Sequence, residues 1–262
     1  MITTGSIINY GDHALQQIKF FRYLPKNSRA IVLIHGGAWR DPNNTYDDFQ
    51  ELNQHFNQHS VNDVNIIGIN YRLSPEFIHP THLYDVFLAL QFIDKTVSPT
   101  SILMVGHSVG ATLMLQLLNY VQIMKLGGKD IAADFSGVLD KIDTMYFVDG
   151  IYDISALIEE YGEGYKEFVT MAFGEEHTLE GATQMGLADF EGFAHFPKKF
   201  VVVHSQQDEL LSMHQPDIFV EFLQRNGIQA TVVKGAWGKH EEVYRRVELA
   251  QLISREEAAC GN

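Results

Sequence analysis

Short runs of apolar residues recur along this chain of 262 residues, and most are followed by a segment with helical spacing. We predict strands at residues 30–34, 64–70, 101–105, 145–148, 200–204 and 230–233. We predict helices near residues 46–59, 82–95, 111–124, 216–226 and 241–254. Because a continuously apolar strand must be covered on both faces, this alternation predicts an α/β fold with a mostly parallel central sheet between helices.

Two regions depart from this rhythm. Residues 6–23 precede the first predicted strand of the parallel set, and we expect them to add antiparallel edge strands. Residues 154–196 are acidic and contain several glycines, and we predict that they form a helical insertion between two strands. We therefore expect one domain over residues 1–262, with a small cap at about 154–196 that covers the carboxyl edge of the sheet.

The charge balance disfavours several classes of partner. There are 33 acidic and 19 basic residues, so the formal net charge is −14. Neither nucleic acid nor an anionic membrane is an expected partner, because binding either one needs clustered Lys and Arg. No apolar run approaches the roughly 18 residues that a membrane helix needs. The start lacks the features of a secretory signal, and the one cysteine, Cys260, excludes an intrachain disulfide. We expect a cytoplasmic protein.

The strongest single motif is Gly106-His107-Ser108-Val109-Gly110. It follows a predicted strand and precedes an apolar-faced helix, an arrangement in which a serine projects from a strained tight turn. In that position Ser108 is the candidate nucleophile. The alternative interpretation is a serine in an ordinary turn.

A serine hydroxyl needs a base to remove its proton, and the base needs a carboxylate to orient it. His240 is the candidate base, since it alone lies between the predicted last strand and the last helix; the other histidines after Ser108 are His177, His195, His204 and His214. Asp208 is the candidate acid because it follows the predicted strand at 200–204 by a short polar turn. Asp149 and Glu209 remain alternatives for the acid.

The first predicted strand of the parallel set runs into "HGGAW", residues 35–39. Attack by a serine creates an oxyanion, which must be met by preorganised N–H donors. We expect Gly36 and Gly37 to supply such donors together with Val109, the residue after the nucleophile; the alternative is a close-packed turn without a ligand. Trp39 either lines a substrate pocket or packs this loop onto the protein, and both interpretations stay open.

Metal and cofactor motifs are weak in this chain. His79, His82 and Asp85 could be spaced along a helix like metal ligands, but no fourth ligand accompanies them, and we expect a solvated helix N-terminus instead. No glycine-rich phosphate-binding motif follows a strand. We therefore expect no metal and no cofactor.

In this order, "HGGAW", "YRLSPE" and "GHSVGA" resemble the α/β-hydrolase branch that contains hormone-sensitive-lipase-like esterases and arylformamidases. Lipase-like members more often have a third glycine where this chain has Ala38. Together with "SQQDELL" and "GKHEEVY", the motifs are most similar to those of fungal kynurenine formamidases.

The resemblance implies an enzyme that hydrolyses N-formylkynurenine to kynurenine and formate in tryptophan catabolism. The family's catalytic triad maps onto Ser108, Asp208 and His240, and its HGGxW segment maps onto residues 35–39. It implies a small aromatic formamide as the substrate. Oligomeric state is open, a homodimer being one possibility. A general short-acyl carboxylesterase and a catalytically silent binding module are the competing hypotheses.

Overall fold

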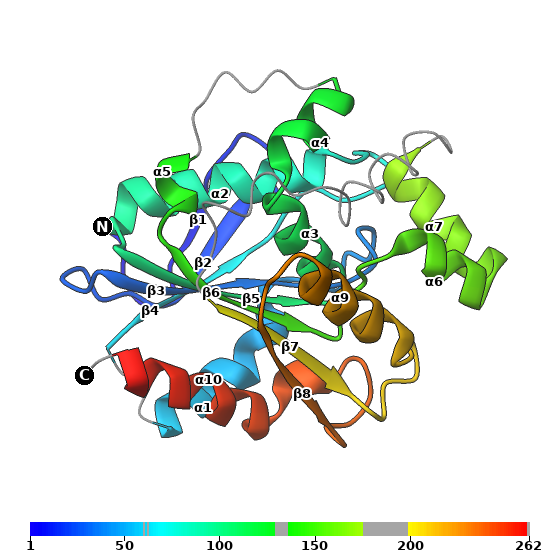
Figure 1. Ribbon diagram of the computed structural model, residues 1–262. Coiled ribbons are helices and arrows are strands. Elements are labelled where there is room, and N and C mark those ends of the chain that lie inside the picture. Colours follow the sequence, from blue (N-terminus) through cyan, green and yellow to red (C-terminus); the bar gives the residue numbers. More distant parts are fainter. Residues whose placement is uncertain (60, 62, 129–135, 175–198, 261–262) are drawn as a thin grey trace.

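An eight-stranded sheet forms the centre of the protein (Figure 1). The computed structural model describes residues 1–59, 61, 63–128, 136–174 and 199–260. The strand order is β1-β2-β4-β3-β5-β6-β7-β8. Their bounds are β1 Ile7–Asn9, β2 Gln17–Arg22, β3 Arg29–Ile34, β4 Asn65–Ile69, β5 Ser101–His107, β6 Ile142–Val148, β7 Lys199–Ser205 and β8 Ala230–Gly235.

The pairing confirms the predicted sheet. Strands β3 to β8 are parallel to their neighbours within that set, whereas β1 and β2 pair antiparallel at one edge, as expected for residues 6–23. Since the carboxyl ends of parallel strands meet at one edge of a sheet, the residues that follow β3, β5, β6, β7 and β8 are gathered there.

Helices cover both faces of the sheet (Figure 1). Helices α1 and α10 lie on one face, and α2, α3 and α9 lie on the other. The bounds are η1 Tyr46–Phe49, α1 Gln50–Gln58, α2 Thr81–Val97, α3 Val109–Leu117, α4 Tyr120–Leu126, α5 Ser136–Leu139, α6 Ile154–Tyr161, α7 Glu163–Phe173, α9 His214–Arg225, η3 Val243–Arg245 and α10 Val247–Cys260.

Strand β3 illustrates why the strands are continuously apolar. Ile31 and Leu33 belong to the core beneath α1 and α10, whereas Val32 and Ile34 belong to the core beneath α2, α3 and α9. All four side chains are fully buried. Burial of one such side chain stabilises the fold by about 1.5–3 kcal/mol, so both faces of the strand hold the sheet to its helices.

The helix predicted at residues 111–124 is two helices. Helix α3 ends at Leu117 and α4 begins at Tyr120. The N–H groups of Leu118 and Asn119 donate to carbonyls three residues back, at Leu115 and Gln116, which tightens the last turn before the chain redirects. Asparagine favours such breaks because its amide competes for local hydrogen bonds.

Helices α6 and α7 form a projection between β6 and β7 in the chain (Figure 1). Their apolar side chains, among them Leu157 and Phe173, pack with Trp39, Val109 and Ile151, which follow β3, β5 and β6. The two helices therefore lie at the carboxyl edge of the sheet. Of the insertion predicted at residues 154–196, residues 175–196 lie outside the described residues, as do His177 and His195.

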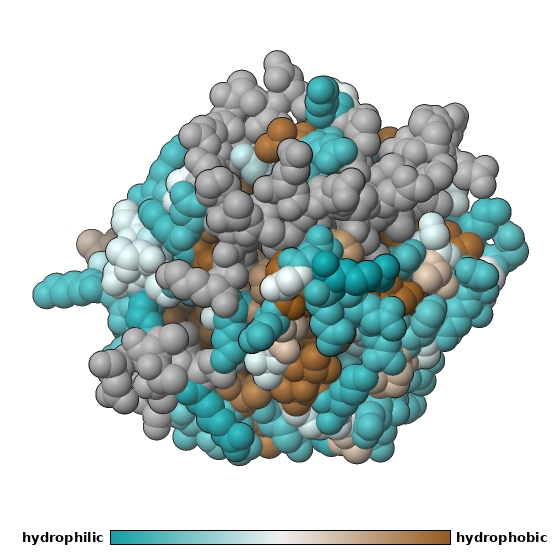
Figure 2. Space-filling model, viewed as in Figure 1, coloured by the Kyte–Doolittle hydropathy of each residue, from teal (hydrophilic) through white to brown (hydrophobic). Residues whose placement is uncertain are grey.

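Among the described residues on the face shown in Figure 2, most side chains are hydrophilic, and apolar ones are exposed in patches between them. Within the described parts of the chain, no helix combines the length and the apolar character needed to cross a membrane.

Candidate active site

Ser108 occupies a strained turn between β5 and α3. Its backbone angles are φ 54° and ψ −122°, in a region that residues with a side chain rarely adopt. The Ser108 N–H donates to the carbonyl of Val148 at the end of β6 (2.9 Å). The strain is thus maintained by the surrounding sheet, and it places the residue at the carboxyl edge.

The two glycines of the motif are required by close packing. A Cβ on Gly106 would lie 2.6 Å from the carbonyl carbon and oxygen of Gly110. A Cβ on Gly110 would overlap the carbonyl oxygens of Ile34 and His35. A side chain at Gly110 would therefore force the turn away from the end of β3, and one at Gly106 would force β5 away from the start of α3.

Asp208 and His240 form a hydrogen-bonded pair. The distance between His240 Nδ1 and Asp208 Oδ2 is 2.7 Å, and both side chains are almost completely buried. Because a carboxylate only accepts, His240 carries its proton on Nδ1 in this pair, and Nε2 is left free to act as a base. The other oxygen of Asp208 accepts from the N–H groups of Leu210 and Leu211, each at 2.8 Å.

Opposing effects set the pKa values of this pair. Burial alone would raise the pKa of Asp208, but the hydrogen bond and charge of His240 and the N–H groups of Leu210 and Leu211 hold it below its ordinary value. Burial alone would lower the pKa of His240, but the hydrogen bond to Asp208 and nearby carboxylates raise it above its ordinary value. Asp208 therefore stays ionised while His240 titrates.

The raised pKa of His240 predicts the pH profile. Only the neutral imidazole can take a proton from Ser108, so kcat/KM should fall as pH drops through the pKa of His240. Because that pKa is raised, we expect the midpoint of the acid limb above the ordinary histidine value of about 6.5. Initial rates across the pH range will measure it. A midpoint at or below that value would contradict the assignment of His240 as an Asp208-paired base.

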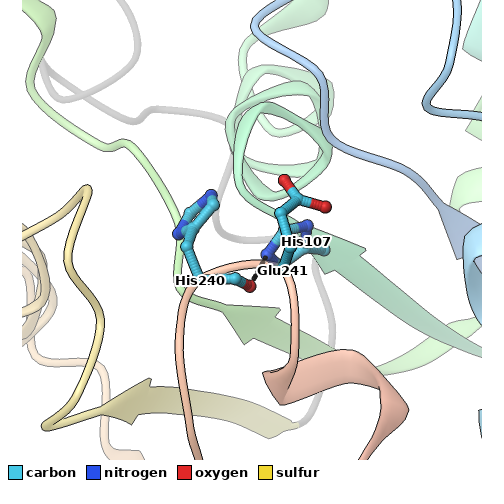
Figure 3. A group of neighbouring side chains, drawn as sticks. All are labelled: His107, His240 and Glu241. Carbon is cyan, nitrogen blue, oxygen red and sulfur yellow. Dashed lines mark hydrogen bonds between the residues drawn. The ribbon is translucent and has the colours of Figure 1, made fainter.

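His107, the residue before Ser108, holds the loop that carries His240 (Figure 3). Its Nε2–H donates to the backbone carbonyl of His240 at 3.0 Å, and its ring lies 4.6 Å from the ring of His240. Burial drives the pKa of His107 well below its ordinary value, so the ring is neutral. Sequence reasoning missed this role, although His107 is the second residue of the glycine–serine motif.

Two groups of three side chains in the described residues are close enough to share an ion: His107, His240 and Glu241, and Asp149, His204 and Asp208. In the first group, His107 Nε2 and His240 Nδ1 already donate hydrogen bonds. In the second, Asp208 is the partner of His240. We assign neither group to a metal. The expectation that His79, His82 and Asp85 form a solvated helix N-terminus is wrong: all three are buried, and Asp85 pairs with Arg72 at 2.6 Å.

The loop after β3 approaches Ser108 closely. A Cβ on Gly36 would lie 3.0 Å from the Cβ of Ser108, so only glycine fits there without a shift. Gly37 follows with φ +90°, and Ala38 and Trp39 also have positive φ. Gly37 lines the pocket that contains Ser108, and Gly36 is not among the described lining residues. Gly36 is therefore packed against Ser108, whereas Gly37 borders the cavity.

Tyr71 fixes the direction of this loop. Its hydroxyl lies 2.9 Å from the carbonyl oxygen of Gly36 and 3.1 Å from that of His35. The Gly36 oxygen also accepts from His35 Nδ1 at 3.0 Å, and the His35 ring stacks on Tyr71 at 4.4 Å. In a trans peptide the N–H points opposite to the carbonyl. The N–H of Gly37 is thus directed away from Tyr71. Val109 begins α3, where N–H groups have no partner within the helix.

Trp39 is fully buried behind the pocket. Its ring packs edge-on against Phe173 of α7, with 5.0 Å between centroids, and lies 6.2 Å from Phe168. It is not among the described lining residues, whereas its neighbour Ala38 is. These contacts favour the interpretation that Trp39 packs the loop onto α7.

Ser108 and His240 line one cavity of about 240 Å³. Tyr165 and Phe168 of α7 provide aromatic surface, and the charged side chains are Arg40, Asp41 and Glu241. Four further lining residues lie inside the quoted motifs, namely Ala38, Leu210, Leu211 and Glu241. The motifs did not indicate the others: Arg40, Asp41, Asn44, Ile151, Tyr165 and Phe168. Of these, Arg40 and Asp41 directly follow "HGGAW", and this position is the one sequence signal that could have suggested them.

The sheet order, the turn at Ser108 and the placement of the loops at the carboxyl edge define an α/β-hydrolase. Solved structures agree with this fold. Esterase B from Lactobacillus rhamnosis is 14% identical, with a TM-score of 0.70 over 99% of this chain and 90% of that one. An esterase from Pyrobaculum calidifontis is also 14% identical, with a TM-score of 0.68 over 94% and 81%.

The BD-FAE family matches residues 22–223. The kynurenine formamidase of Scheffersomyces stipitis is 41% identical over 94% of this chain and 97% of its own length. That of Debaryomyces hansenii is 38% identical over the same shares, and that of Saccharomyces cerevisiae is 32% identical over 89% and 90%. The chain belongs to the BD-FAE family and to the kynurenine formamidase family.

Proposed function

We propose that this protein hydrolyses the formamide of N-formyl-L-kynurenine to L-kynurenine and formate, a step of tryptophan catabolism. The observation that carries the proposal is the Asp208–His240 pair at a cavity that also contains Ser108. The likeness to kynurenine formamidases over nearly the whole chain supports the choice of substrate.

In the first step the hydroxyl of Ser108 attacks the formyl carbon while Nε2 of His240 takes its proton. The tetrahedral intermediate collapses when the C–N bond breaks, and His240 returns the proton to the departing aryl amine. Kynurenine leaves, and the formyl group remains as an ester on Ser108.

The oxyanion of this intermediate needs N–H donors on one side of the formyl carbon. We assign the N–H groups of Gly37 and Val109 to this role, with Gly36 as the third candidate. Tyr71 supports the assignment by holding the Gly36 carbonyl on the opposite side of the peptide. Gly36 contributes clearance, because any larger residue would meet Ser108.

In the second step a water molecule attacks the formyl ester, and His240 again acts as the base. Its proton returns to Ser108, and formate is released. Asp208 remains ionised through both steps and stabilises the imidazolium each time it forms.

We propose that the chain is a single domain and that α6 and α7 act as its cap. Tyr165 and Phe168 of α7 face the cavity and offer aromatic surface to the kynurenine ring. Trp39 supports this wall from behind through Phe168 and Phe173.

Arg40 is a candidate partner for the carboxylate of the substrate. It is the cation among the described lining residues, and its Nη1 lies 3.2 Å from Met171 Sδ and 3.9 Å from the exposed carboxylate of Glu167. Arg40→Gln should raise KM for N-formylkynurenine about tenfold or more with a small change in kcat. The reason is that Arg40 would bind the carboxylate equally well in the substrate complex and in the transition state.

Formanilide, which lacks the amino-acid group, is the matched substrate and should show no such change in KM. Arg225→Gln on α9 is the control variant. An equal rise in KM for both substrates would contradict a carboxylate contact at Arg40.

The decisive experiment for the function compares N-formylkynurenine with a simple aryl ester on the purified protein. Kynurenine should appear from the first substrate, measured by its absorbance, with the larger kcat/KM. Efficient ester cleavage without formamide cleavage would favour a general carboxylesterase, and the two structural neighbours above are esterases by name. Failure to react with a serine-directed fluorophosphonate would favour a silent binding module.

We propose that the protein acts in the cytoplasm on this small molecule. The single cysteine is compatible with a reducing compartment. Fractionation of cells that express the tagged chain would test the location, and sedimentation of the purified protein would give its oligomeric state.

A further inference from the structure

Asp149 is a buried carboxyl group to which the reaction above gives no role. It follows β6 directly, its side chain is completely buried, and its backbone has φ 41°. It was an alternative for the triad acid, but the structure pairs His240 with Asp208. A buried carboxyl in a strained position beside that pair needs an explanation.

The hydrogen bonds of Asp149 are few. Its Oδ1 accepts from the backbone N–H of Ser205 at 2.8 Å. Its Oδ2 is buried and has no hydrogen-bond partner among the described residues. One N–H donor is far short of what an ionised carboxylate needs when it is removed from water.

His204 does not supply the missing donor. Its Nε2 lies 3.1 Å from the carbonyl oxygen of Leu211, which only accepts, so Nε2 carries a proton. Burial lowers the pKa of His204, and the neutral ring has a single proton. Its Nδ1, 3.3 Å from Asp149 Oδ1, therefore presents a lone pair to Asp149.

Asp208 faces the same cluster. One side-chain oxygen or nitrogen atom from each of Asp149, His204 and Asp208 lies within 4.8 Å of the others. Asp208 must be ionised to orient His240. An ionised Asp149 would thus face the negative charge of Asp208 and the lone pair of His204 Nδ1. A protonated Asp149 could instead donate a hydrogen bond to one of these two acceptors.

We propose that Asp149 is held as a neutral carboxylic acid and donates a hydrogen bond toward Asp208, which makes it a positioning residue for the catalytic pair. In this arrangement Asp208 is the only negative charge in the cluster of Asp149, His204 and Asp208, and Asp149 adds a donor that stabilises its ionised form. The inference depends on the Ser108–His240–Asp208 chemistry and holds for a formamide or an ester substrate.

Electrostatics support this protonation state. Burial, and then the charge of Asp208, raise the pKa of Asp149 well above its ordinary value. The titratable groups that face it are Asp208, His204, His240 and Tyr152. Burial raises the pKa of Tyr152 far above its ordinary value, so this hydroxyl is also neutral.

The test compares Asp149→Asn with Asp149→Ala. An asparagine can accept from Ser205 with its oxygen and donate toward Asp208 with its nitrogen, so it should keep kcat within about threefold and leave the acid limb in place. Alanine removes the donor and should lower kcat by roughly 10- to 100-fold, the effect of losing a hydrogen bond to a charged group.

Glu241→Gln is the matched control for charge, because the charge of Glu241 raises the pKa of His240. This variant should move the acid limb to lower pH. If Asp149→Asn moves the limb in the same direction, Asp149 is ionised in the native protein and the proposal is wrong. Equal kcat for the asparagine and alanine variants would also overturn it, since no donor would then be needed.

Infrared spectroscopy gives a readout that does not depend on activity or on the alanine variant. Protein with isotope-labelled aspartate should show the carbonyl stretch of a protonated carboxyl at neutral pH, and Asp149→Asn should lack it. Absence of that band from the wild-type protein would refute the neutral acid. An aryl ester serves for the kinetics if N-formylkynurenine is not a substrate, so failure of the proposed function would be seen separately.

Discussion

Replacing Ser108 by alanine should lower kcat on the order of 10⁶-fold, the scale of nucleophile removal in serine hydrolases. No other atom in the proposed mechanism forms the bond to the formyl carbon. The substitution removes one oxygen from a nearly buried side chain, so the fold should be retained. Both the rate of kynurenine release and the labelling by a fluorophosphonate should fall to background.

Ser254→Ala is the matched control. The Ser254 hydroxyl donates to the carbonyl of Ala250 within α10 (2.6 Å), on the far side of the sheet from α3. It should keep full activity and labelling. If Ser108→Ala retains kcat within about tenfold, or is still labelled, the nucleophile is another residue and the proposed acyl-enzyme pathway fails.

Replacing Asp208 by asparagine should lower kcat about 10⁴-fold. The amide of asparagine can donate toward Nδ1 of His240, which favours the tautomer with its proton on Nε2. That tautomer cannot accept a proton from Ser108. The same change removes the carboxylate that raises the pKa of His240, so the acid limb of the profile should move to lower pH.

Glu209→Gln tests whether Asp208 or the adjacent Glu209 is the acid that orients His240. Glu209 Oε2 accepts from the backbone N–H of His240 at 3.0 Å and does not contact the ring in a hydrogen bond. Its neutral replacement should cost far less activity than Asp208→Asn. A larger loss at Glu209 than at Asp208 would transfer the role of triad acid to Glu209.

The sheet was predictable because its strands are apolar on both faces and each ends in a polar or glycine-rich turn. The six predicted strands of the parallel set are present with small shifts in their ends. Chain order then placed Ser108, Asp208 and His240 at one edge, since each follows a parallel strand. At this edge the structure has the hydrogen bond between Asp208 and His240.

Other features depended on contacts between distant segments. Asp149 and Asp208 both follow strands that end at the same edge, and local sequence cannot decide which carboxyl reaches His240. The side of the loop on which Trp39 packs depends on Phe173, more than 130 positions later. The hydroxyl of Tyr71 reaches back to the Gly36 carbonyl from the loop after β4. Such contacts carry no periodic signal.

The packing of Gly110 against the carbonyls of Ile34 and His35 has a consequence for engineering this enzyme. It packs the turn at Ser108 directly against the loop after β3, so neither can be shifted without displacing the other. Attempts to widen the substrate range should therefore leave residues 34–37 and 106–110 unchanged. Tyr165, Phe168, Leu210 and Leu211 line the same cavity from other segments of the chain and are the positions at which variation can be selected.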